Sequence, residues 1–229
     1  MQVLFDNLAA VVIGSTVLLI VAFTQFRGQE AAIDGVQYYA AKSQMVDFVR
    51  QVQLDLQNVG AGVPNADVET GQALVSYSAT NDTTAVFTFQ TYADSLSFAP
   101  KPGPDVVCYR RELTGETAHV RDPTVGGYEE KPTFRIVRRV NPTAPAACTG
   151  GTETSTSMAS LTEFHISLQR DNGTETSTFS EVRQLRLHVR GVSPLGGGET
   201  EHLGGMKQHV DETRFNSVIR PPNLTRYEP

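Results

Sequence analysis

The stretch LAAVVIGSTVLLIVAFTQF, residues 8–26, decides the fold, because it is an apolar run that contains no charged residue. A hydrocarbon layer about 30 Å thick is crossed by roughly 20 helical residues at a rise of about 1.5 Å each. Residues 3–26 supply that length if Asp6 and Asn7 lie within the layer or at its edge. We therefore predict a helix that spans a membrane once.

This helix is predicted to continue beyond the apolar run, since no proline follows until Pro64. After the apolar run, apolar residues recur at a spacing of three and four positions. This spacing is typical of an amphipathic helix. The two halves then form one helix of about 50 residues and about 80 Å. The apolar stripe of the second half is expected to pack on the protein's own sheet. Its members are Met45, Phe48, Val52, Leu56 and Val59, with Gln44, Asp47, Arg50, Gln51, Gln53 and Asp55 mostly off it.

The rest of the chain is predicted to be a β-sheet, because from Gln72 onward the pattern changes to period two with β-branched and aromatic residues. Asn81 and Asp82 are expected to turn the first pair of strands, and residues 171–173, Asp-Asn-Gly, the last pair. Residues 141–160 and 191–205, rich in Pro, Thr, Ser and Gly, are expected to be mobile surface loops. The predicted strands cover residues 73–79, 85–92, 95–98, 105–113, 133–140, 161–169 and 181–189.

The fold class that these elements predict is α+β, with a long hydrophobic-then-amphipathic helix packed on an antiparallel β-rich head. The expected parts are residues 1–27, a transmembrane or filament-core helix; residues 28–63, its amphipathic continuation; and residues 64–229, the head. No basic residue precedes the apolar run, so we expect a retained anchor rather than a cleaved signal.

Two cysteines, Cys108 and Cys148, both lie beyond the apolar run. In a non-cytoplasmic head they would form one disulfide, worth about 3–4 kcal/mol in the chain-entropy model. The alternative is a pair of unrelated buried thiols. Arg27, on the carboxyl side of the run, favours a cytoplasmic head by the positive-inside rule, whereas the Ser-, Thr- and Gly-rich head with its cysteine pair favours the outside. We give the head composition more weight.

The charge balance gives no reason to expect a nucleic-acid partner, because 19 basic residues face 25 acidic ones and the net charge is −6. The predicted strands nevertheless carry five arginines that could form a patch for DNA or an acidic surface. The interpretation that we favour is that these arginines lie on the wet, solvent-exposed faces of strands and pair with Asp and Glu. These arginines are Arg110, Arg111, Arg135, Arg138 and Arg139.

The chain carries no motif for catalysis, cofactor binding or phosphate binding, so we expect no enzyme, no cofactor and no small-molecule substrate. One cluster has metal-ligand residue types, but it lies in a glycine-rich stretch without fixed ligand spacing. We read it as a solvated loop and expect no metal. Its members are Glu199, Glu201, His202, His209 and Asp211.

Three features mark both ends of the chain. An acidic residue, Asp6, and a mid-segment glycine, Gly14, interrupt the hydrophobic half of the helix, and FVRQVQLDLQNVGAGV, residues 48–63, ends its second half. RFNSVIRPPNL, residues 214–224, lies near the end of the chain. In these features the chain resembles type IV pilins and type II secretion pseudopilins, and residues 48–63 are most similar to the larger minor pilins.

The resemblance implies a structural subunit that enters the inner membrane and then assembles through its N-terminal helix into an extracellular filament or pseudopilus. Its partners would be copies of itself or related pilins. Family members are made with a basic leader, so Met1 is either the first residue after cleavage or the start of an unprocessed chain.

The expected assembly residues are Met1, Asp6 and Gly14. The Asp6 carboxylate would pair with the α-amino group of a neighbour's Met1, or would cap the helix start in the headgroup region. Gly14 would allow close helix approach, or is simply a tolerated glycine. The competing function is a monomeric, signal-anchored surface protein whose β-rich head binds a ligand or partner.

Overall fold

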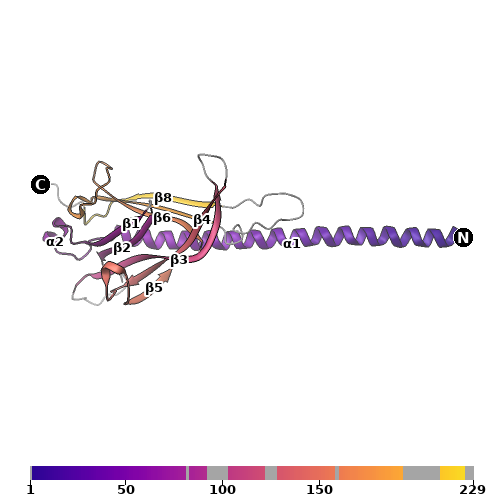
Figure 1. Ribbon diagram of the computed structural model, residues 1–229, viewed down its shortest axis with the longest axis horizontal. Helices are drawn as coiled ribbons and strands as arrows, with labels where there is room; N and C mark the ends of the chain where they lie inside the picture. The colour runs from indigo at the N-terminus through magenta and orange to yellow at the C-terminus, as the bar shows by residue number, and fades with distance from the viewer. Residues whose placement is uncertain are drawn as a thin grey trace. The chain divides into compact units, whose positions relative to one another are not determined.

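The computed structural model describes residues 2–80, 83–91, 103–121, 128–157, 160–192 and 212–224. By contacts between Cα atoms the chain divides into two compact units, Met1–Ala40 and Ala41–Pro229. The second unit therefore contains the last part of the long helix together with the sheet. The coarse architecture is an N-terminal apolar helix and a large antiparallel sheet, and β-structure dominates this architecture (Figure 1).

Helix α1 runs without a break from Gln2 to Gln57, which confirms the prediction of one continuous helix. It ends where the backbone N–H of Asn58 donates to the carbonyls of Leu54 and Asp55. Gly60 then adopts a φ of +78°, and its N–H donates to the Gln90 carbonyl at 2.8 Å. A left-handed residue is a common helix stop, and glycine adopts it without strain. A short helix, α2 (Asn65–Glu69), follows.

Within the described residues, eight strands form one antiparallel sheet in the order β1-β2-β3-β4-β6-β7-β8, with β5 paired to β4 beside this path. Two short 3₁₀ helices, η1 (Pro145–Ala147) and η2 (Phe179–Glu181), lie in the connections. The strands are β1 (Leu74–Thr80), β2 (Thr83–Thr91), β3 (Asp105–Arg121), β4 (Tyr128–Val140), β5 (Thr152–Thr156), β6 (Leu161–Gln169), β7 (Gln184–Val192) and β8 (Glu212–Ile219).

The two predicted hairpins are present, but the second one is connected differently. β1 pairs with β2 and β6 pairs with β7, both antiparallel. The Asp-Asn-Gly turn does not join β6 directly to β7: Gly173 N–H donates to the Arg170 carbonyl, and Glu175 bridges back to Gln169. The chain then passes through η2 before β7 begins, so the predicted strand start at Glu181 is wrong.

The prediction of a surface loop over residues 141–160 is confirmed in its exposure, since most of the described part is exposed, but is wrong in expecting a loop throughout, because that part contains η1 and strand β5. Gly151, with a φ of +69°, is packed against the chain: an added Cβ would lie 2.5 Å from the Asn141 carbonyl oxygen. β3 and β4 are also longer than predicted, and β8 was not predicted. The predicted strand over residues 95–98, and the loop from residue 193 to residue 205, lie outside the described residues.

The main core lies between the last turns of α1 and one face of the sheet, as predicted from the helix stripe. All five stripe residues are at most 7% exposed. Phe48 of α1 contacts Phe164 of β6 with ring centroids 6.1 Å apart. Each fully buried apolar side chain contributes about 1.5–3 kcal/mol. The sheet side of this core includes Phe87, Phe89, Tyr109, Ile136, Ile166, Leu168, Leu185, Leu187 and Val189.

Candidate functional site

The first candidate site is the apolar segment, Ala10–Gln29, which is the part of α1 long and apolar enough to cross a membrane. It has 20 residues and a mean hydropathy of 1.8, and none of it is buried within the protein. Its large apolar side chains are between 46% and 72% exposed. A lipid layer or other apolar helices would remove this surface from water.

The three hydroxyl side chains of the apolar segment are hydrogen-bonded inside the helix. The Thr16 hydroxyl donates to the Val12 carbonyl at 2.7 Å, and the Ser15 hydroxyl donates to the same carbonyl at 2.9 Å. The Thr24 hydroxyl donates to the Ile20 carbonyl at 3.0 Å. Because these hydroxyls have internal partners, their transfer into hydrocarbon is less costly than that of unpaired groups.

The three predicted assembly residues have no common site within the described chain. Met1 lies outside the described residues, and Asp6 is described only by its backbone in α1. At Gly14 an added Cβ would meet nothing within 4 Å. No contact within the described chain therefore requires a glycine at this position, and the pairing of Asp6 with Met1 stays a prediction.

A buried charged bridge joins α1 to the sheet. We define the Asp55 bridge as Asp55 of α1, Tyr109 of β3 and Arg138 of β4. Arg138 Nε donates to Asp55 Oδ2 at 2.6 Å, and its Nη2 donates to Oδ1 at 3.1 Å. The Tyr109 hydroxyl also donates to Asp55 Oδ2. Both side chains of the ion pair are at most 8% exposed.

This bridge was not predicted from the sequence. Asp55 was expected mostly off the packed stripe and Arg138 on a wet strand face, but both are buried; the expected pairing of Arg138 with an acidic residue is confirmed. Asp55 lies three residues after Val52 and next to Leu56, so helical spacing alone places it on the buried side. That spacing was the available signal, but it does not identify the partner on β4.

The electrostatics of the Asp55 bridge keep Tyr109 neutral and Arg138 charged. Burial, and then the charge of Asp55, raise the pKa of the Tyr109 hydroxyl well above its usual value. Burial alone would lower the pKa of Arg138, but the hydrogen bond and charge of Asp55 outweigh it and raise that pKa. A neutral phenol and a permanently charged guanidinium suit a structural contact between helix and sheet.

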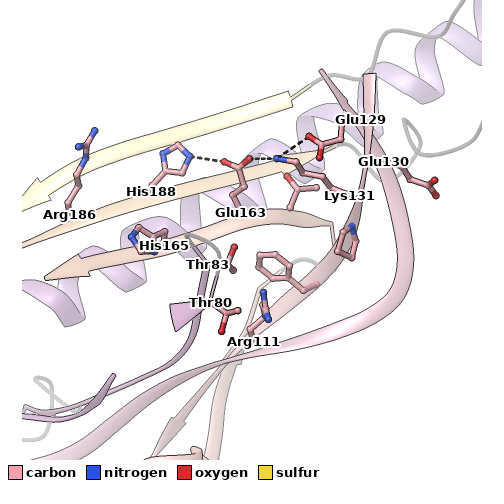
Figure 2. A pocket seen from close by; sticks show the side chains of 13 residues that line it. Thr80, Thr83, Arg111, Glu129, Glu130, Lys131, Glu163, His165, Arg186 and His188 are labelled. Carbon is pink, nitrogen blue, oxygen red and sulfur yellow. Dashed lines mark hydrogen bonds and ion pairs between the residues drawn. The ribbon is translucent and has the colours of Figure 1, made fainter. Parts of the chain in front are cut away.

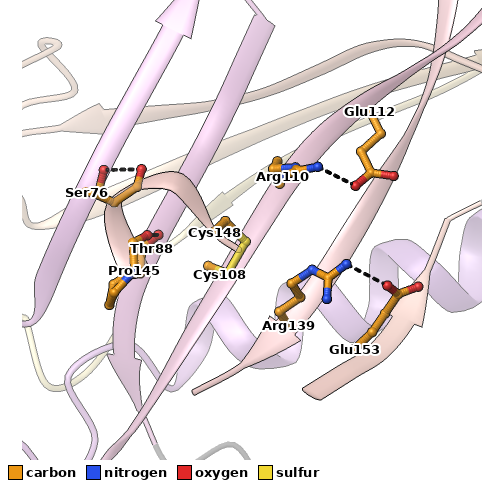
Figure 3. The surroundings of a disulfide bond; sticks show 10 residues. Ser76, Thr88, Cys108, Arg110, Glu112, Arg139, Pro145, Cys148 and Glu153 are labelled. Carbon is orange, nitrogen blue, oxygen red and sulfur yellow. Dashed lines mark hydrogen bonds and ion pairs between the residues drawn. A yellow bond between two sulfur atoms is a disulfide. The ribbon is translucent and has the colours of Figure 1, made fainter. Parts of the chain in front are cut away.

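The disulfide joins Cys108 of β3 to Cys148 just after η1, with their Cα atoms 5.7 Å apart (Figure 3). Both cysteines are fully buried. The Thr88 hydroxyl donates to the Pro145 carbonyl at 2.8 Å, which holds η1 against β2. The cross-link and this hydrogen bond therefore fix the segment after β4 onto the β2–β3 ladder.

Three of the five arginines have acidic partners at the surface, as the wet-face interpretation predicts. Arg110 and Arg135 both contact Glu112, at 2.8 and 3.0 Å. Arg139 contacts Glu153 at 2.8 Å. Burial would raise the pKa of Glu112, but its hydrogen bonds with Arg135 and Arg110 outweigh that and lower it. The remaining strand-face cation, Arg111, lies over the Phe134 ring with Cζ 5.6 Å from the centroid.

A second charged cluster lies on the sheet face opposite α1, centred on Glu163 of β6 (Figure 2). His188, Lys131 and Arg190 contact its carboxylate at 3.0, 3.1 and 2.9 Å. The hydrogen bond with His188, followed by those with Arg190 and Lys131, holds the pKa of Glu163 well below its usual range despite partial burial. We call these four residues the Glu163 network.

Within the described ranges no group of three or more His, Cys, Asp or Glu side chains could hold a metal ion. The glycine-rich cluster of Glu199, Glu201, His202, His209 and Asp211 lies outside the described residues, so its interpretation as a solvated loop stays a prediction.

Comparison of the chain with protein-family models, curated proteins and solved structures finds no match. Function is therefore inferred from the exposed apolar segment, the packing of the later turns of α1 on the sheet, and the charged face of the sheet.

Proposed function

We propose that this chain is a structural, pilin-like subunit that assembles through its N-terminal helix into an extracellular filament or pseudopilus. The observation that carries the proposal is the contrast within α1. None of the apolar segment is buried within the protein, while the later turns of the same helix are buried against the sheet and held by the Asp55 bridge. Such a chain presents an uncovered apolar helical segment to partners outside itself.

The hydrophobic effect supplies the driving force, at about 25 cal/mol for each Å² of apolar surface removed from water. A membrane provides this burial before assembly, and the helices of neighbouring subunits provide it in the filament. A carboxylate at the edge of hydrocarbon is costly. Asp6 would offset that cost by pairing with the α-amino group of Met1 in a neighbouring subunit, so that assembly is selected by charge.

The disulfide supports a head outside the cytoplasm, since disulfides persist in oxidising compartments. The subunit would then reside in the inner membrane before assembly, with its sheet on the outer side. It would later lie in an extracellular filament or at the cell surface.

A second function, a monomeric anchored protein whose head binds a ligand, draws support from a different observation. The sheet face opposite α1 carries a charged cavity of about 690 Å³. A membrane anchor would need the apolar segment but not charge selection at Asp6.

The test is electron microscopy of material sheared from cells that make this protein, with mass spectrometry of its N-terminus. The filament proposal expects this chain within sheared filaments. If the intact chain is found only in membranes, the anchored monomer is the correct function.

Charge reversal separates the two functions at a single residue. Asp6→Lys is expected to reduce the yield of sheared filaments at least tenfold while the chain still reaches the membrane fraction. The matched control is Asp171→Lys, the same charge change at an exposed turn of the head, which should leave the yield unchanged. Wild-type filament yield from Asp6→Lys would contradict charge-selected assembly.

A further inference from the structure

Many charged side chains on the surface of the head are paired within the chain, but among the described residues two groups near opposite ends of the sheet are not. Arg110, Arg135, Arg139 and Arg170 each contact a glutamate within 3.0 Å. The two groups that differ are separated by sign, since one is basic and the other acidic. Exposed charges without a counter-charge inside the chain are available to a partner outside it.

The basic pair, Arg186 and Arg220, lies where β7 begins and β8 ends. Arg186 is opposite Val218 in the ladder, and Arg220 follows the last residue of β8. Each guanidinium is oriented by an amide: Arg186 Nε donates to Asn216 Oδ1 at 3.3 Å, and Arg220 Nε donates to Gln184 Oε1 at 3.2 Å. Both arginines are exposed, and no carboxylate of the described chain contacts either one. Their terminal nitrogens can therefore donate to an external anion.

The acidic group, Glu116, Glu129 and Glu130, lies on the ribbon that β3 and β4 form. All three residues are exposed. Glu130 accepts a hydrogen bond from the hydroxyl of Thr117, the residue after Glu116. Within the described ranges Lys131 is the one cation in contact with the group, with Nζ 3.7 Å from Glu129, and it is shared with the Glu163 network. The group therefore keeps an excess of negative charge.

The basic pair and the acidic group are too far apart to neutralise each other within one subunit. Val192, the last residue of β7, packs in a small apolar cluster with two residues of β3 in the ribbon that carries the acidic group. Arg186 lies near the other end of β7, and at about 3.3 Å per residue the strand between them spans roughly 20 Å. Figure 2 shows this separation, with Arg186 at one end of the face and Glu129 and Glu130 at the other. This distance exceeds the Debye length of about 8 Å at physiological ionic strength.

We propose that the heads of neighbouring subunits pack head to tail, with the basic pair of one copy against the acidic group of the next. The contact rests on the filament function proposed above and adds a second interface, outside the N-terminal helix. Because the two surfaces differ, the contact is heterologous, which is the kind that can repeat along a helical filament. Planar guanidinium groups match carboxylates in a two-bond geometry, and the reverse arrangement would bring like charges together.

The test is the yield of sheared filaments from full-length chains with reversed charges. Arg186→Glu combined with Arg220→Glu should lower the yield at least tenfold, and Glu129→Lys combined with Glu130→Lys should do the same. A chain with all four substitutions has both surfaces reversed, so its yield should return to within about threefold of wild type. Thermal unfolding of each purified chain in detergent checks that the head is folded.

A matched control uses one charge reversal at each of two exposed arginines. Arg135→Glu changes an arginine of β4 that is paired with Glu112 inside its own chain, and it should leave the yield unchanged. Arg186→Glu alone should lower the yield. Equal yields from these two variants would contradict the contact.

Cysteine cross-linking locates the contact without removing a charge. The two native cysteines are joined to each other, so introduced thiols have only one another as partners. Val218→Cys beside Arg186, combined with the exposed Thr117→Cys, should link subunits of oxidised filaments into a ladder on a non-reducing gel. Val218→Cys combined with Glu153→Cys, at an exposed position of β5, should not.

The outcomes separate this contact from the function on which it rests. Filaments from the wild-type chain together with full yield from a folded double reversal, or with no recovery in the folded four-substitution chain, would overturn the contact alone. Absence of the ladder from filaments of the Val218→Cys, Thr117→Cys chain would also overturn it. Absence of filaments from the wild-type chain would refute the proposed function and the contact with it.

Discussion

The two halves of α1 have the same backbone conformation and opposite environments. In the apolar segment the large apolar side chains are 46–72% exposed, whereas the five stripe residues of the later turns are at most 7% exposed. The later half finds its partners in the sheet of its own chain. The contrast shows that exposure of the apolar segment is not a general property of this helix, and that the described core of the protein does not cover it.

The polar groups in the two halves of α1 also differ in their hydrogen-bond partners. The hydroxyls of Ser15, Thr16 and Thr24 bond to carbonyls of the same helix. Asp55 instead depends on Tyr109 and Arg138 of the sheet. The hydroxyls of the first half therefore find their partners within the helix, while Asp55 in the second half finds its partners only when the head is folded.

The largest effect should come from Asp55→Ala, which leaves the Arg138 guanidinium buried without its counter-charge. Removing one partner of a buried ion pair costs about 3–5 kcal/mol. Denaturant unfolding of the full chain in detergent would measure this loss. Asp47→Ala, on the exposed side of the same helix, should stay within about 0.5 kcal/mol of wild type. A cost below about 1 kcal/mol for Asp55→Ala would show that the bridge does not stabilise the head.

The next largest effect is expected when the same substitution, Leu→Ala, is made in each of the two halves of α1. Leu56 is fully buried and Leu19 is 70% exposed. Leu56→Ala should lower the free energy of unfolding of the head by about 2–5 kcal/mol through the cavity it leaves. Leu19→Ala should change it by less than about 0.5 kcal/mol. Equal losses from the two variants, measured by thermal unfolding in detergent, would contradict the division of α1 into two environments.

A smaller, pH-dependent effect should be confined to the head. Glu163→Gln should cost on the order of 2 kcal/mol at pH 7, because hydrogen bonds to a charged group are lost. The native pKa of Glu163 is depressed, while the unfolded carboxyl titrates near about 4.3. The stabilisation is therefore complete above the unfolded pKa and is lost as the pH falls below it towards the native pKa.

The measurement is the difference in midpoint temperature between wild type and Glu163→Gln at pH 7 and pH 3. This difference should shrink at pH 3. A constant difference would mean that the variant acts through packing and not through charge. The helical signal of the apolar segment should not change over this range, since Ala10–Gln29 has only one charged residue, Arg27.

The smallest effect is expected for Gly14→Ala. No atom lies within 4 Å of the added Cβ, so head unfolding should not change, and helix propensity should favour alanine by up to about 1 kcal/mol. Any clear loss should appear only in assembly, as a lower filament yield, because small residues allow helices to approach closely. Unchanged filament yield would identify Gly14 as a tolerated glycine.

The sequence was sufficient to predict the elements whose residues repeat with a clear period. The apolar run and the three-and-four spacing of Met45, Phe48 and Val52 predicted α1 and its packed face, and the alternation in β2 and β6 predicted those strands. The prediction failed for strands that are defined by their pairing with a neighbouring strand and not by an alternating apolar pattern. Thr152–Thr156 has no apolar alternation, and β8 is defined by its register with β7.

The charged sites were less predictable, because their members are far apart in the chain. Asp55 and Arg138 are separated by 83 positions, and no local pattern connects them. The cavity results from the divergence of β4 and β6, which pair at one position. Residue types such as Arg111 and Arg186 are visible in the sequence, but their common cavity is a property of the folded sheet.

The position of the Asp55 bridge has a mechanical consequence. It lies in the last turn of α1, close to the helix end at Gln57, and attaches to β3 and β4, which are joined along a long ladder. Side chains project sideways from a helix, so a pull along α1 loads the bridge and the stripe residues in shear, and these contacts must break together. Tension that enters through the helix is therefore transmitted to β3 and β4 in the middle of the strand order, and not to an edge strand of the sheet.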